Sequence, residues 1–175
     1  MRVPDRLETA RLVLRRWTED DRDAIVAIWT EPAVWEVLHP GQPTDHPAAA
    51  TRFDHHLDHW EEHGFGLYAL RERGDPAVLG WAGPTHPDGV PGLEHEVEIG
   101  WTLALRGRGR GLATEAGRAT AEVALAALDL DEVISLIDPG NEPSLAVARR
   151  LGMTKRESAF NERFGIELDV YSLRR

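Results

Sequence analysis

The stretch Leu105-Arg106-Gly107-Arg108-Gly109-Arg110-Gly111-Leu112 alternates arginine with glycine between two segments of regular pattern. Before it, residues 94–103 alternate apolar and polar side chains as a β-strand does, with Val97, Ile99, Trp101 and Leu103 on one side. After it, the alanine-rich segment 112–128 has the small-residue face of a helix that packs closely on a sheet. The stretch therefore connects a strand to the N-terminus of a helix.

Such a turn can direct several main-chain amides toward one point, where the helix end carries about half a positive charge. Glycines let the backbone approach a phosphate oxygen without a Cβ in the way, and arginine side chains add charged donors. The turn predicts an anion site, with a diphosphate as the favoured ligand. A plain surface turn rich in glycine and arginine is the alternative.

Three other phosphate-binding interpretations fit less well. A P-loop ends in Gly-Lys-Ser/Thr, whereas Gly111 is followed by Leu112 and Ala113. A dinucleotide fingerprint beginning at Gly107 needs a third glycine where Leu112 stands, and it belongs to the first strand–helix unit of a chain. RNA-binding Arg-Gly segments lie in low-complexity regions, but this one lies between two regular elements.

The composition is that of a globular protein. The chain has 175 residues, 42% of them hydrophobic, which predicts a single domain over residues 1–175. Asp and Glu number 30 against 20 Lys and Arg, a net charge of −10 that disfavours nucleic acid and favours basic or amine-bearing partners. Because the chain has no Cys, disulfides, thiolate metal sites and a cysteine nucleophile are excluded.

The N-terminus lacks the apolar core of a signal peptide, and no apolar run reaches the roughly 20 residues that cross a bilayer. We therefore expect a soluble, cytoplasmic protein with no membrane partner. The sequence leaves the oligomeric state open, with a homodimer among the options.

The remaining patterns predict an α/β (α+β) chain with a mixed sheet. The segment 10–17 reads as a strand at or near a sheet edge, and the apolar run 133–137 reads as a central strand. Residues 32–47 read as a loop or a broken helix. The other expected strands are 65–70, 77–82, 154–158 and 166–173, and the other expected helices are 18–32, 47–63 and 143–152.

Arg106 to Gly111 fits the Q/R-x-x-G-x-G/A signature of the GCN5-related N-acetyltransferases (GNAT). Four segments resemble the ribosomal-protein-acetyltransferase (Rim-like) branch of that superfamily, in the expected order: Leu7 to Arg15, Glu98-Ile99-Gly100-Trp101, Gly109 to Ala116 and Asn141 to Met153. The resemblance implies a mixed, mostly antiparallel central sheet with flanking helices. Two parallel strands, 94–103 and 132–138, splay apart within it.

The resemblance also implies that acetyl-CoA is a cosubstrate and binds in the gap between these strands, with no metal. Its pyrophosphate is expected on the amides of Arg108, Gly109, Arg110, Gly111, Leu112 and Ala113, with Thr114 nearby. Its pantetheine arm is expected to pair with the backbone of Trp101, Thr102 and Leu103, and Asn141 is expected to contact the same arm. An exposed strand edge offers the unpaired N–H and C=O groups that such an arm needs.

Acyl transfer to an amine needs a base for the ammonium proton and an acid for the departing thiolate. Glu98 is the expected base, directly or through a water, because it precedes Ile99-Gly100-Trp101 on the strand that would hold the thioester. A plain solvated strand carboxylate is the alternative. Glu96 and His95 are weaker candidates, and His95 points to the opposite face by alternation.

Many members of the superfamily use a tyrosine as the acid, and the resemblance puts Ala148 at its position. In the Rim-like branch a serine at the position of Ser144 is expected to contact the sulfur of coenzyme A. A hydroxyl that caps the following helix is the alternative for Ser144. Tyr171 is a third candidate, expected to pack on the sheet. Without cysteine, direct attack in a ternary complex is favoured over an acyl-enzyme.

Two groups of side chains have no assigned role. His55, His59 and His63 recur at helical spacing, which favours a solvated or substrate-facing row over a metal site because no fourth ligand is evident. The indoles of Trp35, Trp60 and Trp81 could shape an acceptor pocket or pack in the core.

The function predicted is transfer of an acetyl group from acetyl-CoA to a primary amine. The acceptor is a protein N-terminal amine or a small amine such as an amino sugar or an antibiotic. An acyl-CoA-binding module without turnover is the alternative, and an RNA-binding protein is a third hypothesis, which the acidic charge disfavours.

Overall fold

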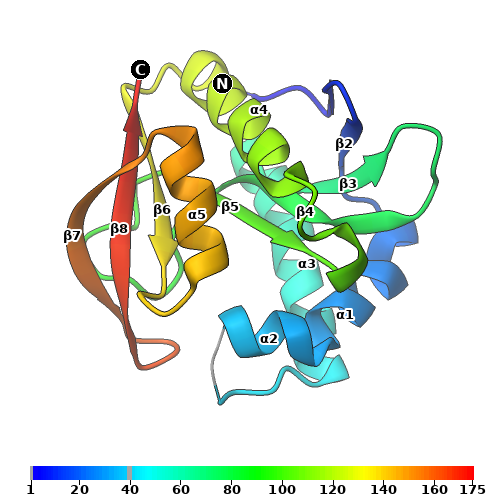
Figure 1. Ribbon diagram of the computed structural model, residues 1–175, viewed down its shortest axis with the longest axis horizontal. Coiled ribbons are helices and arrows are strands. Elements are labelled where there is room, and N and C mark those ends of the chain that lie inside the picture. The colour runs from blue at the N-terminus through cyan, green and yellow to red at the C-terminus, as the bar shows by residue number, and fades with distance from the viewer. Residues whose placement is uncertain (1, 39–40) are drawn as a thin grey trace.

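The computed structural model describes residues 2–38 and 41–175. Within this part of the chain, eight strands form one sheet in the order β1-β2-β3-β4-β5-β6-β8-β7 (Figure 1). The strands are β1 (Arg6–Glu8), β2 (Leu12–Arg16), β3 (Tyr68–Glu72), β4 (Val78–Thr85), β5 (Glu98–Leu103), β6 (Glu132–Ile137), β7 (Thr154–Asn161) and β8 (Ile166–Arg174). Neighbouring strands run antiparallel except β5 and β6, so the predicted fold class is confirmed.

The splay predicted between two parallel strands is present. β5 and β6 share one register pair, Glu98 with Ile134, and the Ile134 amide donates to the Val97 carbonyl at 2.9 Å. Just beyond, the buried Ser135 hydroxyl donates to the Ile99 carbonyl at 2.7 Å. From there β5 stays with β4 and β6 stays with β8, so one edge of β5 is left without a strand neighbour.

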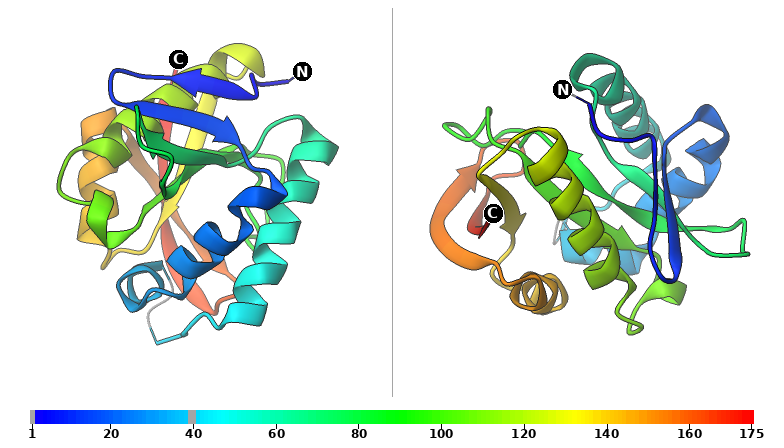
Figure 2. Two further views of the ribbon diagram at one scale, coloured as in Figure 1. Left: turned by 90° about the vertical axis from the view of Figure 1, so that its right-hand side faces the viewer. Right: turned by 90° about the horizontal axis from the view of Figure 1, so that it is seen from above.

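Helices cover both faces of the sheet (Figure 2). On one face, Ile25, Trp29 and Phe53 pack with Leu67 and Trp81 of the strand region. On the other face, α4 packs its small residues closely on the sheet, as the sequence pattern predicts. The helices are α1 (Arg22–Thr30), α2 (Pro32–Leu38), α3 (His46–His63), α4 (Leu112–Ala127) and α5 (Glu142–Leu151).

Helix ends follow the expected chemistry. Gly64 after α3 and Gly152 after α5 take left-handed conformations with φ of 73° and 84°. Asp45 begins α3 by accepting a hydrogen bond from the Ala48 amide at 2.8 Å. None of the helices in the described ranges combines the length and the apolar character of a membrane span.

Several predicted boundaries are wrong. The strand predicted over 94–103 begins at Glu98, because residues 94–97 turn, so Glu94, Glu96 and Glu98 do not share a strand face. Glu96 instead forms an ion pair with Arg156 at 2.7 Å.

At the N-terminus, the short strand β1 was not predicted, and it puts β2 one position inside the sheet edge. The segment predicted as a loop or broken helix contains α2, while residues 39–40 of it lie outside the described residues. Strand β3 begins at Tyr68, three residues later than predicted, because the chain after Gly64 first crosses from the helix layer to the sheet.

Replacing Ser135 with Ala tests how far the splay depends on one hydrogen bond. The change leaves the buried carbonyl of Ile99 without its donor, so the free energy of unfolding should fall by about 1–3 kcal/mol. Chemical denaturation at pH 7 measures it. Ser172→Ala is the matched control, since Ser172 is also buried but makes no side-chain hydrogen bond to the described residues. Equal losses in the two variants would contradict the assignment.

Candidate active site

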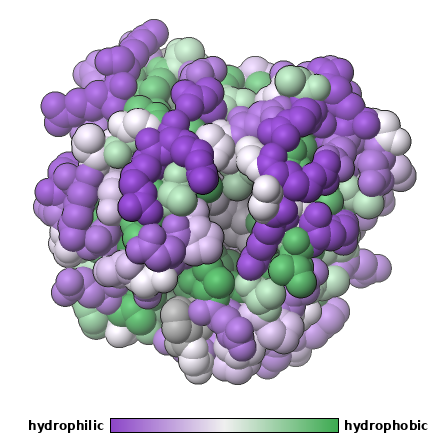
Figure 3. Space-filling view, viewed as in Figure 1, coloured by the Kyte–Doolittle hydropathy of each residue, from purple (hydrophilic) through white to green (hydrophobic). Residues whose placement is uncertain are grey.

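A cavity of about 550 Å³ opens where β5 has lost its strand neighbour. Its walls come from the edge of β5, the glycine-rich turn, the first turn of α4, and the helices α2 and α5. This face of the molecule is hollowed near its centre, with hydrophilic residues along the rim (Figure 3). Most residues of the predicted coenzyme A site line this cavity. They are Trp101, Thr102, Leu103, Arg108, Gly109, Gly111, Leu112, Ala113, Thr114, Asn141 and Ser144.

The glycine-rich turn presents main-chain donors at this cavity. Gly109 and Gly111 have φ of 74° and 76°, a region that favours glycine, and this lets the chain enter α4 abruptly. Among the described residues, the N–H groups from 109 to 114 have no acceptor, and the first bond of the helix runs from Glu115 to the Gly111 carbonyl at 3.1 Å.

The buried hydroxyl of Thr114 also lacks a partner among the described residues, and Thr114 lines the cavity. A polar atom that is shielded from water and has no partner is costly unless a ligand supplies one. Main-chain N–H groups and this hydroxyl at a helix N-terminus are the donor set that a phosphate needs. The arrangement fits the predicted anion site.

The arginine side chains of the turn do not surround that site as expected. Arg106 donates to the Val78 carbonyl, and Arg108 donates to the carbonyls of Leu103 at 3.0 Å and Ala33 at 2.8 Å. Arg110 forms a two-point ion pair with Glu72 of β3. Each guanidinium thus fastens the turn to another part of the fold, and the main chain is left to meet the anion.

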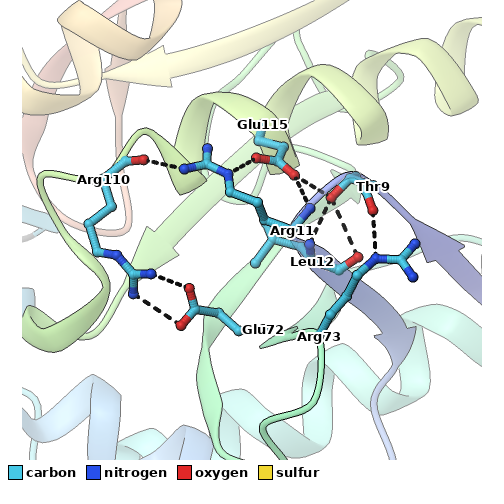
Figure 4. Close-up of polar contacts among 7 residues, drawn as sticks. All are labelled: Thr9, Arg11, Leu12, Glu72, Arg73, Arg110 and Glu115. Carbon is cyan, nitrogen blue, oxygen red and sulfur yellow. Dashed lines mark hydrogen bonds and ion pairs between the residues drawn. The ribbon is translucent and has the colours of Figure 1, made fainter.

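A second contact holds the turn from the N-terminal hairpin (Figure 4). Arg11 donates from Nη1 to the Arg110 carbonyl at 2.7 Å and from Nε to Glu115 at 2.6 Å. Glu115 also accepts from the Thr9 hydroxyl at 2.5 Å. Partial burial raises the pKa of Glu115, but the hydrogen bonds from Thr9 and Arg11 outweigh it and leave that pKa low. The turn and the start of α4 are therefore fixed together by one ionised cluster.

A smaller cavity of about 250 Å³ adjoins the first and shares Trp101, Thr102, Asn141 and Ser144 with it. Its walls carry aromatic rings from several elements, among them Trp29 of α1, His56 of α3, Trp81 of β4 and Phe164 of the β7–β8 turn. The two cavities thus meet at the split between β5 and β6, one with main-chain donors and the other with aromatic and charged side chains.

Glu98 lies at the base of the split and lines the smaller cavity. Burial of its carboxyl raises its pKa to about 7, against an opposing hydrogen bond from the Leu136 amide. A carboxyl with such a pKa exchanges its proton near neutral pH, as a general base must. Glu98 is half-buried in the cavity wall, which distinguishes it from a fully solvated strand carboxylate. The weaker candidates His95 and Glu96 line neither cavity.

Asn141 and Ser144 begin α5 at the junction of the cavities. Asn141 caps the helix by accepting from the Ser144 amide at 3.1 Å, so the Ser144 hydroxyl is not needed as the cap. Ala148 is fully buried. Tyr171 packs on the core cluster beneath α5, as expected for a third candidate.

The predicted solvated row is confirmed for His55 and His63, which are exposed, and is wrong for His59. His59 is buried, bonds the Phe65 carbonyl at 2.9 Å and accepts from the His86 amide at 3.1 Å. Burial lowers its pKa to about 4. His55 and His59 line the smaller cavity, whereas His63 does not. Within the described residues, no group of three or more His, Cys, Asp or Glu side chains is arranged to hold a metal ion.

Of the three tryptophans singled out, Trp81 lines the smaller cavity. Trp60 is a core residue whose indole donates to the Leu67 carbonyl at 2.8 Å, and Trp35 lines neither cavity. Sequence reasoning missed Trp29, Arg52 and Arg163, which line the smaller cavity from three separate elements. No local pattern marks them, because only the folded chain brings them together.

The comparisons with known proteins agree with this geometry. Residues 11–154 match the acetyltransferase (GNAT) domain. The chain belongs to the GNAT acetyltransferase family. This confirms the predicted family and makes the protein an acetyl-CoA-dependent N-acetyltransferase.

Individual relatives cover nearly the whole chain. An acetyltransferase of Agrobacterium tumefaciens, known from its crystal structure, shares 30% identity at a TM-score of 0.84, covering 100% of this chain and 96% of its own. The uncharacterized N-acetyltransferase p20 of Bacillus licheniformis is 25% identical over 94% of this chain and 92% of its own. A ribosomal-protein-S5-alanine acetyltransferase of Vibrio fischeri has the same fold, with 15% identity, a TM-score of 0.74 and coverages of 97% and 96%. That likeness shows a common fold.

The raised pKa of Glu98 makes stability depend on pH. Between about pH 4.5 and 7 the unfolded chain loses this proton while the folded chain keeps it, so the free energy of unfolding falls as pH rises. The Glu98→Gln variant has no carboxyl at this position, so this fall in the free energy of unfolding with rising pH is absent. The stability of the variant relative to the parent should therefore rise by roughly 3 kcal/mol across that window, as measured by urea denaturation at stepped pH.

Glu94→Gln is the control, since main-chain hydrogen bonds from residues 94 and 92 lower the pKa of Glu94 instead. Its contribution is present above about pH 4.5 and is lost as pH falls through the lowered pKa, so this variant should lose relative stability with rising pH. Parallel pH profiles for the Glu98 variant and the parent would show that Glu98 has an ordinary pKa.

Proposed function

We propose that the protein transfers the acetyl group of acetyl-CoA to a primary amine held in the smaller cavity, by direct attack in a ternary complex. The observation that carries this is the junction of the two cavities at the β5–β6 split, with Glu98 at its base and Ser144 on the shared wall. The continuous sheet supports one catalytic domain over residues 1–175. Our proposal includes a cytoplasmic location for the protein. It allows either a monomer or a homodimer.

The larger cavity would hold the cosubstrate. The main-chain amides from Gly109 to Ala113 would bind the pyrophosphate, and Thr114 would supply the buried hydroxyl. The Arg108 amide, predicted as part of this set, donates to the Leu105 carbonyl at 3.2 Å instead. The open edge of β5 from Trp101 to Leu103 would pair with the amide groups of the pantetheine arm, as an added strand does. Asn141, at the junction, would contact the same arm near the thioester.

The chain's own groups then handle the two protons. Glu98 accepts a proton from the ammonium of the acceptor, directly or through a water, which frees the nitrogen lone pair for attack. The new bond joins this nitrogen to the acetyl carbon, and the carbon–sulfur bond breaks. The Ser144 hydroxyl donates its proton to the departing sulfur and takes up the second proton that the nitrogen loses as the amide forms, so the sulfur leaves as a thiol. Free coenzyme A and an N-acetylated product remain.

The acceptor is a protein N-terminal amine or a small amine. A cavity of about 250 Å³ takes the end of a chain or a molecule of amino-acid size. If the protein instead held acyl-CoA without turnover, the cosubstrate would bind with no thiol released in the presence of any amine.

Arg11→Ala tests the cosubstrate site without touching the cavity. The change removes the contact that fixes the Arg110 carbonyl, so the turn should lose its fixed orientation and coenzyme A should bind roughly tenfold more weakly. Isothermal titration calorimetry measures the Kd. Arg73→Ala is the matched control: Arg73 has the same 48% side-chain exposure and belongs to the same cluster, but it contacts Thr9 and Glu8 rather than the turn. Equal affinities in both variants would refute this role of the turn.

Substituting the two proposed catalytic groups tests the chemistry. Glu98→Gln should lower kcat by about 10²–10³-fold and remove the rise in rate near pH 7, because Gln cannot accept the proton. Ser144→Ala should lower kcat by about tenfold. Release of free thiol from acetyl-CoA with a panel of amines gives the rates, and Glu94→Gln is the control for charge. Unchanged turnover in both active-site variants would discredit the assignment.

A further inference from the structure

Gly100 lies at the middle of the β5 face that borders the smaller cavity. On this face Thr102 lines both cavities at their junction, Gly100 follows, and Glu98 lies at the base of the split. A strand rises about 3.3 Å per residue, so Glu98 and Thr102 are roughly 13 Å apart with Gly100 midway. Because a base acts within hydrogen-bond reach or through one water, the atoms of the proposed reaction meet above Gly100.

The space that a side chain on Gly100 would fill is empty. Leaving aside the two adjoining residues, no heavy atom of the described chain lies within 4 Å of the point where a Cβ would stand. Gly100 is not among the glycines with a positive φ, so other residues can adopt its backbone conformation. Neither backbone strain nor protein packing therefore requires a glycine here.

The cross-strand neighbour of Gly100 is the opposite case. Gly83 of β4 pairs with Gly100 in register, and a Cβ on Gly83 would lie 2.4 Å from the Gly66 carbonyl oxygen and 2.9 Å from the Cα of Leu67. The main chain at Gly66 and Leu67 thus requires a glycine at position 83. The floor of the cavity is covered at Gly83 and open at Gly100.

Apolar side chains border this open space. β5 and β6 pair at Glu98 and Ile134, so Gly100 and Leu136 take corresponding positions two residues further along, on either side of the split. Leu136 and Leu67 both line the smaller cavity. An aliphatic chain gains free energy when it is buried among such groups, whereas a charged group would lose its water.

We propose that Gly100 sets the size of the acyl group that the enzyme transfers, and that the open space above it admits propionyl as well as acetyl. The inference rests on the proposed function and deepens it, because it names the class of acyl donor. Carbon atoms in contact lie about 3.5–4.0 Å apart, so a further carbon can occupy the vacant Cβ position without moving a neighbour. The bonds change as for acetyl, and the products are an N-propionyl amine and free coenzyme A.

A series of acyl donors tests this with the amine that the parent acetylates fastest. The parent should use propionyl-CoA with a kcat/KM within about tenfold of that for acetyl-CoA. In Gly100→Ala the added methyl group fills the open space, so the ratio of kcat/KM for propionyl-CoA to that for acetyl-CoA should fall at least about tenfold. Thiol release gives the rates, and a ratio within one variant cancels differences in the folded fraction.

A second variant changes the same space in the other direction. Leu136→Ala widens it, so the ratio of kcat/KM for butyryl-CoA to that for acetyl-CoA should rise at least about fivefold. Leu173→Ala is the matched control, because Leu173 is also half-buried, on the neighbouring strand β8, but lines neither cavity. Its ratio should stay within about twofold of that of the parent.

Three results would overturn the proposal. They are an unchanged propionyl ratio in folded Gly100→Ala, an unchanged butyryl ratio in Leu136→Ala, and a parent that uses propionyl-CoA more than about tenfold less well than acetyl-CoA. If Gly100→Ala does not fold, the Leu136 variant and the parent still decide the matter.

Calorimetry separates this proposal from the proposed function. Gly100→Ala should raise the Kd of propionyl-CoA at least about fivefold while the Kd of free coenzyme A stays within about twofold. If the parent acylates no amine but binding depends on acyl length in this way, the proposed function fails and the acyl site stands. If the parent acetylates amines and the loss in Gly100→Ala follows the size of the amine instead of the acyl length, the proposed function stands and this inference fails.

Discussion

The structure depends on the separation of β5 and β6 after a single register pair. Parallel strands in a sheet are ordinarily bonded along their length, and here the Ser135 hydroxyl takes up the Ile99 carbonyl as the strands part. The separation leaves main-chain groups of β5 open to a ligand, and it brings the larger and smaller cavities together. With the strands paired to their ends, β5 would have no open edge beside which the two cavities could meet.

A second set of contacts holds the glycine-rich turn beside the separated strands. The glycine-rich turn is held from two sides, through Arg110 by Glu72 and through the Arg110 carbonyl by Arg11 (Figure 4). These contacts fix the turn before any ligand arrives, so binding an anion costs little ordering of the chain. The smaller cavity also contains groups fixed by their surroundings. The carboxyl of Glu98, with its raised pKa, lies at the base, and guanidinium groups lie against aromatic rings.

Much of this could be predicted from the sequence because the signals are local. The Arg-Gly turn and the apolar run of β6 each lie within a few residues, and each was placed correctly, whereas α5 is capped by Asn141 and not by the Ser144 hydroxyl that the sequence offered. Prediction failed where the deciding contact is distant. Glu96 alternates with Glu98 in sequence, yet it turns to meet Arg156, and His59 is taken into the core by Phe65 and His86. The lining of the smaller cavity was missed for the same reason, since its arginines come from α3 and the β7–β8 turn.

In the glycine-rich turn, side chains and main-chain amides make different contacts, and this difference has a consequence for sequence comparison. Its arginines bind protein groups while the donors are main-chain amides, which every residue type except proline possesses. The donor set therefore requires the backbone shape set by Gly109 and Gly111 and not any particular side chain in the turn. Lineages can exchange these charges and retain the same cosubstrate, so low sequence identity in this segment is a poor guide to lost function.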